Sequence, residues 1–317
     1  MANVDDALIL VNPREVLEEI IAAVPLDTRK NLTIIGSLAV GLRYENQIQG
    51  MAVRTKDADC LLSPRMEAVD AGRAIAEELI RAGWTPDTTN PLNVPGDQYT
   101  PMDELPVVRL CPPNGAKWFM ELLAVPEAPQ DTGRTFEKLP TSIGYFVLPS
   151  FGSLAVAAFD PEHRMSISIA RPEMMALANM LGHPEILPKT MSRPFHGREI
   201  KRSNKDLGRV LAIALLAERE LEDALLSWPD AWLTALEAVY PDDFSNQVIR
   251  AGDGIRALLS PEHVADFDEA HHTCVYGLLS SNPPTKEKLR LAGERLLEDA
   301  INPLMVKLPG IAGGYSV

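Results

Sequence analysis

The stretch from Leu32 to Leu62 restricts the fold of this chain more than any other part of the sequence. It predicts a strand over Leu32–Ile35, a turn at Gly36 and Ser37, and a short helix over Leu38–Tyr44, before a second strand. A helix that begins at such a turn directs free backbone N–H groups and the positive end of its dipole at the turn. This arrangement is typical of an anion site, and phosphate is a common occupant.

Two aspartates, Asp57 and Asp59, begin the second strand. Because side chains alternate between the faces of a strand, both carboxylates point to the same face, about 6–7 Å apart along the strand. Carboxylates held this close repel each other unless a cation lies between them, and Mg²⁺ favours oxygen ligands of this kind. A phosphate site and a metal site within one strand–helix–strand unit indicate phosphoryl or nucleotidyl transfer.

The order of these residues resembles the signature of the nucleotidyltransferase superfamily related to DNA polymerase β, in which Gly-Ser, a helix and Asp-x-Asp follow one another. Here Gly36-Ser37 and Asp57-Ala58-Asp59 carry it, over about residues 30–125 and toward 215. The run Arg54-Thr55-Lys56-Asp57 is most similar to the bacterial toxin-type branch, the AbiEii-like and MenA-like proteins.

The resemblance implies a magnesium- or manganese-dependent enzyme of a toxin–antitoxin system. Such an enzyme transfers a nucleoside monophosphate from ATP or another NTP and releases pyrophosphate. The acceptor would be a hydroxyl of an RNA, a protein or a small molecule.

A third acidic residue, Glu121, is the only charge in the apolar run that starts at Trp118. The sequence predicts that Lys117–Ala124 pairs as a strand with Val107–Cys111 through the turn at 112–115. A charge in such a strand needs a partner if it is buried. The superfamily places its third acidic residue on a later strand beside the first two, which makes Glu121 the candidate metal ligand. The alternative is a glutamate on the solvated face of an edge strand.

Nucleotide-binding residues are expected around these carboxylates. Gly36 and Ser37 would contact the β- and γ-phosphates through backbone N–H groups and the hydroxyl. Arg54 and Lys56 flank the aspartate strand and would neutralise phosphate oxygens. The alternative for these two cations is a solvated entry to the strand.

The resemblance also implies a lysine and a later aspartate from the helical region. Asp206 matches the aspartate; its alternative is a first-turn carboxylate that complements the helix dipole, worth ~0.3–1 kcal/mol. Asn179 occupies the place of the lysine, and without that lysine the triphosphate contact is incomplete. Lys201 and Lys205 are the candidates to replace it, within a basic cluster that also contains Arg193, Arg198 and Arg202.

The overall composition narrows the function classes. The chain has 317 residues and a formal net charge of −14, which argues against a broad nucleic-acid-binding surface but leaves room for a local basic patch. Three cysteines are too few for a disulfide framework. The sequence shows neither an export signal nor a run of apolar residues long enough to span a membrane, so a cytoplasmic protein without a membrane partner is expected.

We expect an α+β protein. Residues 1–170 are predicted to form a small mixed sheet with flanking helices, like a nucleotidyltransferase, and residues 171–317 a helical domain. Asn12 is expected to cap the first helix and Ser63-Pro64 the helix after the aspartates. Loops are expected at 85–106, as a lid or a mobile insertion, and at 127–140; further strands are expected at 143–148, 154–159 and 165–169.

The helical part is expected to begin at Pro172 and to contain an apolar stripe over 207–215, with Ser203 or Asn204 as the cap. One later helix carries several residue types that bind metals, but not at the spacing of a metal site, so a solvated helix face is expected instead. These residues are Asp266, Asp268, His271, His272 and Cys274.

Three functions of different classes fit the sequence. The first is an active nucleotidyltransferase, which both aspartates favour. The second is a catalytically idle protein of the same fold with a binding or regulatory role, which Asn179 favours. The third is a helical interaction module whose first domain is only a scaffold, and it predicts no nucleotide binding.

Overall fold

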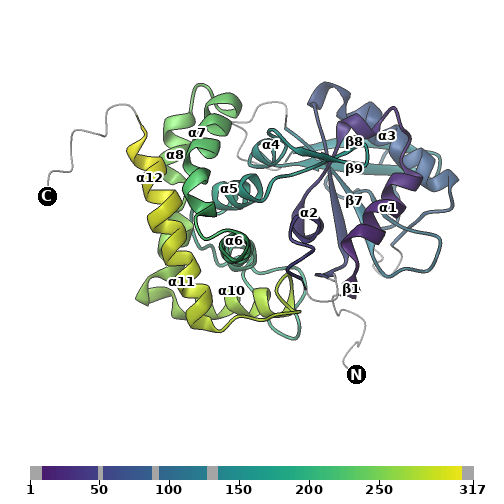
Figure 1. Ribbon diagram of the computed structural model, residues 1–317. Coiled ribbons are helices and arrows are strands. Elements are labelled where there is room, and N and C mark those ends of the chain that lie inside the picture. The colour runs from purple at the N-terminus through teal and green to yellow at the C-terminus, as the bar shows by residue number, and fades with distance from the viewer. Residues whose placement is uncertain (1–8, 49–52, 88–92, 127–134, 309–317) are drawn as a thin grey trace, which may run out of the picture. The chain divides into compact units, whose positions relative to one another are not determined.

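The computed structural model describes residues 9–48, 53–87, 93–126 and 135–308. Within these residues the chain forms two compact units, whose elements Figure 1 labels. The sheet unit comprises residues 9–43 and 55–171, and the helical unit comprises 44–48, 53–54 and 172–308. The protein is therefore a mixed α+β protein, as the sequence predicts.

The chain passes into the helical unit after Arg171, and a short earlier segment also groups with the helices. In that segment the Gln47 side chain donates a hydrogen bond of 3.1 Å to the carbonyl of Leu216. Parts of two expected loops, residues 88–92 and 127–134, lie outside the described residues.

One mixed sheet organises the sheet unit, with strands in the order β10, β11, β2, β4, β7, β6, β5. β4 (Asp57–Leu62) is antiparallel to β2 (Leu32–Ile34) and parallel to β7 (Phe119–Ala124), which is antiparallel to β6 (Arg109–Cys111). β9 pairs with both β7 and β8. The other strands are β1 (Ile9–Val11), β3 (Val53–Thr55), β5 (Thr85–Pro86), β8 (Thr135–Thr141), β9 (Gly144–Ser150), β10 (Glu162–Arg164) and β11 (Ile167–Ile169).

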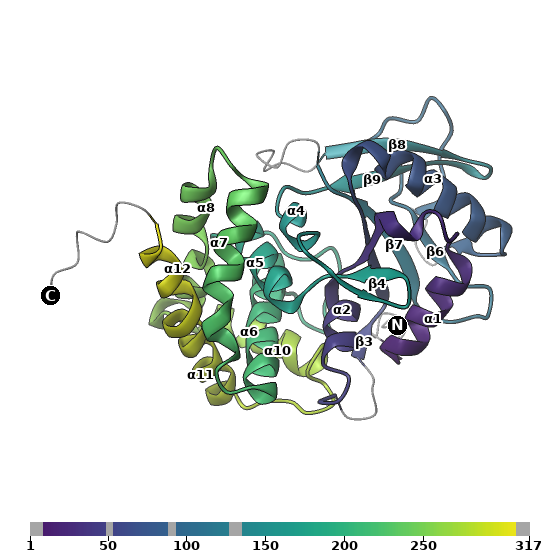
Figure 2. The same ribbon diagram turned by 45° about the horizontal axis from the view of Figure 1, so that its top comes forward.

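Helix α3 (Arg65–Arg81) covers one face of this sheet, and Figure 2 shows it beside the β8–β9 hairpin. A β-carbon at Gly72 would lie 2.9 Å from Leu62 Cδ1, so the face that α3 covers carries Leu62, Cys60 and Ala58. Strand alternation then directs Asp57 and Asp59 to the opposite face. The other helices of this unit are α1 (Pro13–Ala23), the 3₁₀ turn Arg29–Asn31, α2 (Gly36–Arg43) and α4 (Leu154–Ala157).

Several local predictions need correction. Residues 135–140, expected as part of a loop, belong to strand β8, because a hairpin with β9 satisfies their backbone groups. Residues 154–157, expected as a strand, form helix α4. Ser63 does not cap α3, which begins after Pro64 without a side-chain cap. The predicted cap at Asn12 is confirmed, since its side chain accepts from the N–H of Arg14 at 3.0 Å.

Helix α6 (Arg202–Glu220) is the core of the helical unit and contacts α5, α10 and α11 (Figure 1). Its apolar stripe is confirmed, because Leu207, Val210, Leu211 and Ala214 are fully buried. The other helices are α5 (Pro172–Gly182), α7 (Trp228–Val239), α8 (Phe244–Arg250), α9 (Asp253–Leu259), α10 (Val264–Tyr276), α11 (Lys286–Leu296) and α12 (Asn302–Val306). Two 3₁₀ turns (Ala224–Ser227 and Pro261–His263) and a π-helical segment (Leu297–Ile301) connect them.

Across the described parts of the chain, every helix is too short or too polar to cross a membrane.

Candidate active site

A row of charged side chains crosses three neighbouring strands of the sheet unit. Asp59 on β4 lies directly opposite Glu121 on β7, and Glu121 lies directly opposite Arg109 on β6. Residues paired in this way present their side chains to the same face of a sheet. Asp57, two residues from Asp59, shares that face. The structure therefore places the three carboxylates on one face of the sheet, as strand periodicity predicts for Asp57 and Asp59 and as the resemblance implies for Glu121.

The turn before α2 lies against one of these carboxylates. Gly36 has a φ of +70°, a conformation that side chains disfavour, and a β-carbon there would lie 2.4 Å from Asp59 Oδ2. The N–H of Ile35 also donates to the carbonyl of Asp59 at 3.0 Å. The start of α2, with Gly36 buried and Ser37 half-buried, is thus fixed beside the second aspartate.

Asp57 is oriented by a residue that lies just before its own strand. The Thr55 hydroxyl donates a hydrogen bond of 2.6 Å to Asp57 Oδ1, and Thr55 is buried. The N–H of Phe119 donates to the carbonyl of Lys56 at 2.8 Å, which ties the start of β4 to β7. Asp57 and Asp59 are both half-buried, so their carboxylates stay accessible on the polar face.

Glu121 has a charged partner that the sequence analysis missed. Arg109 Nε donates to Glu121 Oε2 at 2.5 Å, and the glutamate side chain is only 13% exposed. Burial lowers the pKa of the Arg109 guanidinium, but Glu121 first, and then Asp57 and Asp59, outweigh burial and raise the pKa above its usual range. The spacing in the sequence could have predicted this pair. Arg109 and Glu121 are each six residues from Gly115 in the hairpin turn, so two antiparallel strands centred on Gly115 place them opposite each other.

The two flanking cations differ in their surroundings. Lys56 is half-buried and has interaction partners of its own. Arg54, on β3, has a buried Nε that hydrogen-bonds to none of the described residues. Their contact with a triphosphate stays a prediction.

In the helical unit, Asp206 is held by cations. His183 Nε2 donates to Asp206 Oδ2 at 2.9 Å, and Arg209 Nη1 lies 3.6 Å from Oδ1. Burial opposes ionisation of this carboxylate, but the His183 hydrogen bond and the charges of Lys205 and Arg209 hold its pKa well below its usual range. Because α6 begins at Arg202, Asp206 lies beyond the first turn, so the alternative of a first-turn dipole contact is wrong.

Lys201 is part of a buried polar network. Its Nζ donates to Asp266 Oδ1 at 2.6 Å, and the side chain of Asn204, fully buried, donates to both Asp266 and Glu269. Asn204 therefore links α6 to α10 and does not cap α6; Ser203 does not cap it either. Lys205 is half-buried beside this network.

Asn179, which stands where the resemblance implies a lysine, donates its amide to the carbonyl of Met175 at 2.7 Å within α5. Its side chain is thus bound to its own helix.

The expectation of a solvated face on α10 is wrong in part. Asp266, His272 and Cys274 are buried, and each has its own partner: Lys201, the carbonyl of Phe195 and the carbonyl of Gly208. His271 Nε2 donates a hydrogen bond of 2.9 Å to the carbonyl of Pro284. These separate contacts are structural and do not converge on one point.

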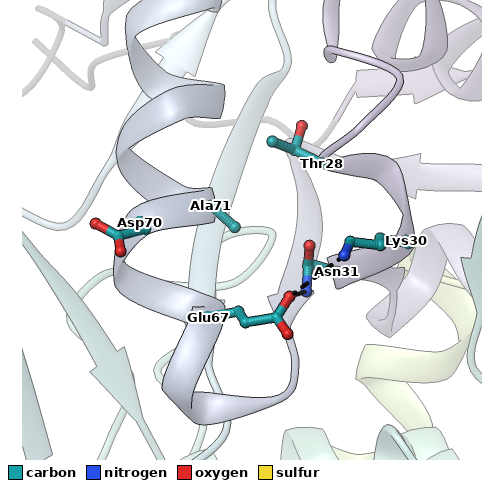
Figure 3. A pocket seen from close by; sticks show the side chains of 6 residues that line it. All are labelled: Thr28, Lys30, Asn31, Glu67, Asp70 and Ala71. Carbon is teal, nitrogen blue, oxygen red and sulfur yellow. Dashed lines mark hydrogen bonds and ion pairs between the residues drawn. The ribbon is translucent and has the colours of Figure 1, made fainter.

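A small open pocket of about 290 Å³ lies elsewhere in the sheet unit (Figure 3). Its lining side chains already pair: Asn31 Nδ2 donates to Glu67 Oε2 at 2.7 Å, and Lys30 lies 3.7 Å from the same oxygen. It contains none of the predicted site residues. Thr28, Asp70 and Ala71 complete the lining.

The donor chemistry of the carboxylate row fits magnesium. In the described residues, no group of three or more His, Cys, Asp and Glu side chains is placed so that it could hold a metal ion. Mg²⁺ does not need such a group, because it is commonly bound by one or two carboxylates together with the phosphates of its substrate. Asp57 and Asp59, with the start of α2 beside them, match that requirement. Comparisons of the chain with protein-family models, with curated proteins and with solved structures find no match.

Proposed function

We propose that this chain is a magnesium-dependent nucleotidyltransferase that moves a nucleoside monophosphate from an NTP to a hydroxyl of an RNA, a protein or a small molecule. The observation that supports it is the position of Gly36: the glycine at the start of α2 packs against Asp59, and Asp59 lies opposite Glu121 on the parallel strand β7. The start of α2, which is the proposed phosphate site, therefore lies next to the carboxylate row on one face of the sheet.

In this proposal, different residues bind the metal ion and the phosphates. Asp57 and Asp59 hold Mg²⁺, or Mn²⁺ in its place, with Thr55 orienting Asp57. Gly36 and Ser37 bind the β- and γ-phosphates through N–H groups and the hydroxyl. Glu121 adds a third oxygen ligand. When bound, the metal ions lower the pKa of the acceptor hydroxyl and stabilise the leaving pyrophosphate.

A second candidate is a binding protein of the same fold that performs no transfer. Two observations favour it: Glu121 is already paired with Arg109, and Asn179 supplies no cation. This candidate retains nucleotide affinity and releases no pyrophosphate.

Calorimetry with each NTP and Mg²⁺, paired with a pyrophosphate-release assay, distinguishes the two. The proposal expects Asp59→Asn to abolish pyrophosphate release, while Asp70→Asn, an exposed carboxylate of α3, leaves it unchanged. NTP binding without pyrophosphate release in the presence of candidate acceptors supports the second candidate. Absence of both binding and release overturns both.

A further inference from the structure

Arg109 is the charged partner of Glu121 at one end of the carboxylate row. Its Nε contacts Glu121 Oε2 at 2.5 Å, and its guanidinium carbon lies 5.5 Å from the centre of the Phe119 ring. The Arg109 side chain is 33% exposed, so solvent reaches it from the polar face. The guanidinium therefore faces the same side of the sheet as Asp57 and Asp59.

The charges of the row explain why this arginine is held there. Three carboxylates on one face repel one another, and a single guanidinium offsets part of that repulsion. Its hydrogen bond to Glu121 is charge-assisted, a type about twice as strong as a neutral one. Arg109 Nε contacts one carboxylate oxygen, Oε2, so a divalent cation that binds Glu121 shares the carboxylate and its negative potential with Arg109.

We propose that Arg109 competes with the divalent cation for Glu121 and thereby lowers the metal affinity of the site. The guanidinium and the metal ion carry like charges, so Arg109 on Glu121 opposes the binding of a metal ion to the same carboxylate. Arg109 is thus a positioning residue that sets the metal concentration at which all three carboxylates act together. This inference rests on the proposed function, because it takes the metal site for granted.

The test measures Mg²⁺ and Mn²⁺ affinity without nucleotide, by calorimetry and by the metal-dependent rise in unfolding temperature. Arg109→Met should lower the metal Kd by about tenfold or more, since it removes both the competing hydrogen bonds and a like charge. Arg109→Lys keeps the charge but loses the planar fork, so a smaller decrease is expected. Arg81→Met is the matched control, because Arg81 is an exposed arginine that pairs with Glu78 in the same unit, and its Kd should equal that of wild type.

Arg109→Met removes the partner of Glu121 and can impair folding. A double variant therefore serves as a second test, and we call it the paired variant. The paired variant, Arg109→Met with Glu121→Gln, leaves the net charge of the row unchanged and removes the Glu121 carboxylate for which Arg109 and the metal ion compete. Its Kd should stay within about threefold of wild type. A tenfold tightening in the paired variant, or no tightening in Arg109→Met, overturns the inference.

Asp57→Asn in the same titration separates this inference from the proposed function. If wild type binds metal through Asp57 and Arg109→Met binds no tighter, the inference fails and the metal site stands. If neither wild type nor Arg109→Met binds metal, both fail.

Discussion

Gly36 and Asp59 fit together only because Gly36 lacks a side chain: a β-carbon would lie 2.4 Å from Asp59 Oδ2. We therefore expect Gly36→Ala to displace the aspartate carboxylate in addition to straining a backbone at φ +70°. Gly115→Ala is the matched control, because Gly115 has a φ of +77° and a β-carbon there would meet no heavy atom within 4 Å.

Both alanine variants should lose about 1–2 kcal/mol of unfolding free energy from the left-handed backbone alone. Only Gly36→Ala should lose more than that and also lose Mg²⁺-dependent stabilisation. Denaturant unfolding with and without Mg²⁺ measures both effects. Equal losses in the two variants would show that the Gly36–Asp59 contact has no energetic role.

Magnesium itself should stabilise the folded protein. If the native carboxylate row binds Mg²⁺, as proposed, and the unfolded chain does not, a hundredfold excess over Kd should add ~2.7 kcal/mol to the free energy of unfolding. Asp57→Asn should abolish this gain without unfolding the protein. Thermal unfolding checks it, and identical Mg²⁺ responses from wild type and Asp57→Asn would exclude the site.

Glu121 should matter for transfer as well as for metal binding. Glu121→Gln should reduce nucleotidyl transfer by at least ~10²-fold, since a misplaced metal ion loses several kcal/mol of transition-state stabilisation. Glu78→Gln, which removes an exposed ion pair with Arg81, should leave the rate unchanged. Full activity in Glu121→Gln would assign the third ligand to another residue.

The central strands and the alternation of their side chains follow from the sequence, whereas the register between strands and the partners of the site residues do not. Period-two alternation places Asp57 and Asp59 on one face because it depends only on local backbone geometry; Glu121 shares that face because of the pairing of β4 with β7. The role of Arg109 depends on a hairpin register, which a pattern of apolar residues alone leaves undetermined. Residues 135–140 were misread for a similar reason: Pro140 is tolerated in a strand whose stability comes from pairing with β9.

The basic residues at the start of α6 also have contacts that the sequence alone does not predict. Lys201 and Lys205 are equivalent in the sequence, yet Lys201 is bound to buried Asp266, which lies 65 residues later in the chain on another helix. Such a contact is set by tertiary packing, which single-sequence spacing does not encode.

These two lysines should therefore respond differently to substitution. Lys201→Met should lower the free energy of unfolding by ~2 kcal/mol, because Asp266 loses a charge-assisted hydrogen bond in a buried network. Lys205→Met should cost less than Lys201→Met, because the charge of Lys205 is one of several that stabilise ionised Asp206. The sequence makes Lys205 a candidate triphosphate contact, and on that expectation Lys205→Met should lower NTP affinity about tenfold. Urea unfolding and NTP calorimetry measure the two effects, and unchanged NTP affinity would remove Lys205 from the site.

Asp266 also predicts a pH dependence. Burial opposes its ionisation, but hydrogen bonds from Lys201, His263 and Asn204 lower its pKa to about 2. A carboxyl whose pKa is lower in the folded than in the unfolded protein adds stability above its unfolded value near 4. That stability should be lost as the pH falls from about 4 to about 2.

Lys201→Met should raise the pKa of Asp266 and shift this loss to higher pH, as circular dichroism between pH 2 and 6 can show (about one pH unit is resolvable). Lys286→Met removes the more exposed pair with Asp268 and should leave the acid transition in place. Identical acid transitions in wild type and Lys201→Met would contradict the assignment.

The row formed by Asp59, Glu121 and Arg109 has a consequence for how the sheet assembles. If β7 slipped by one residue, Glu121 would turn toward the face that α3 covers, where its neighbours Met120 and Leu122 are now fully buried. An unpaired carboxylate there costs several kcal/mol, so misaligned pairings are excluded by charge as well as by packing. The same charged groups that are proposed to take part in catalysis thus also help to fix the alignment of the strands. Variants that remove these charges should allow other strand registers more easily.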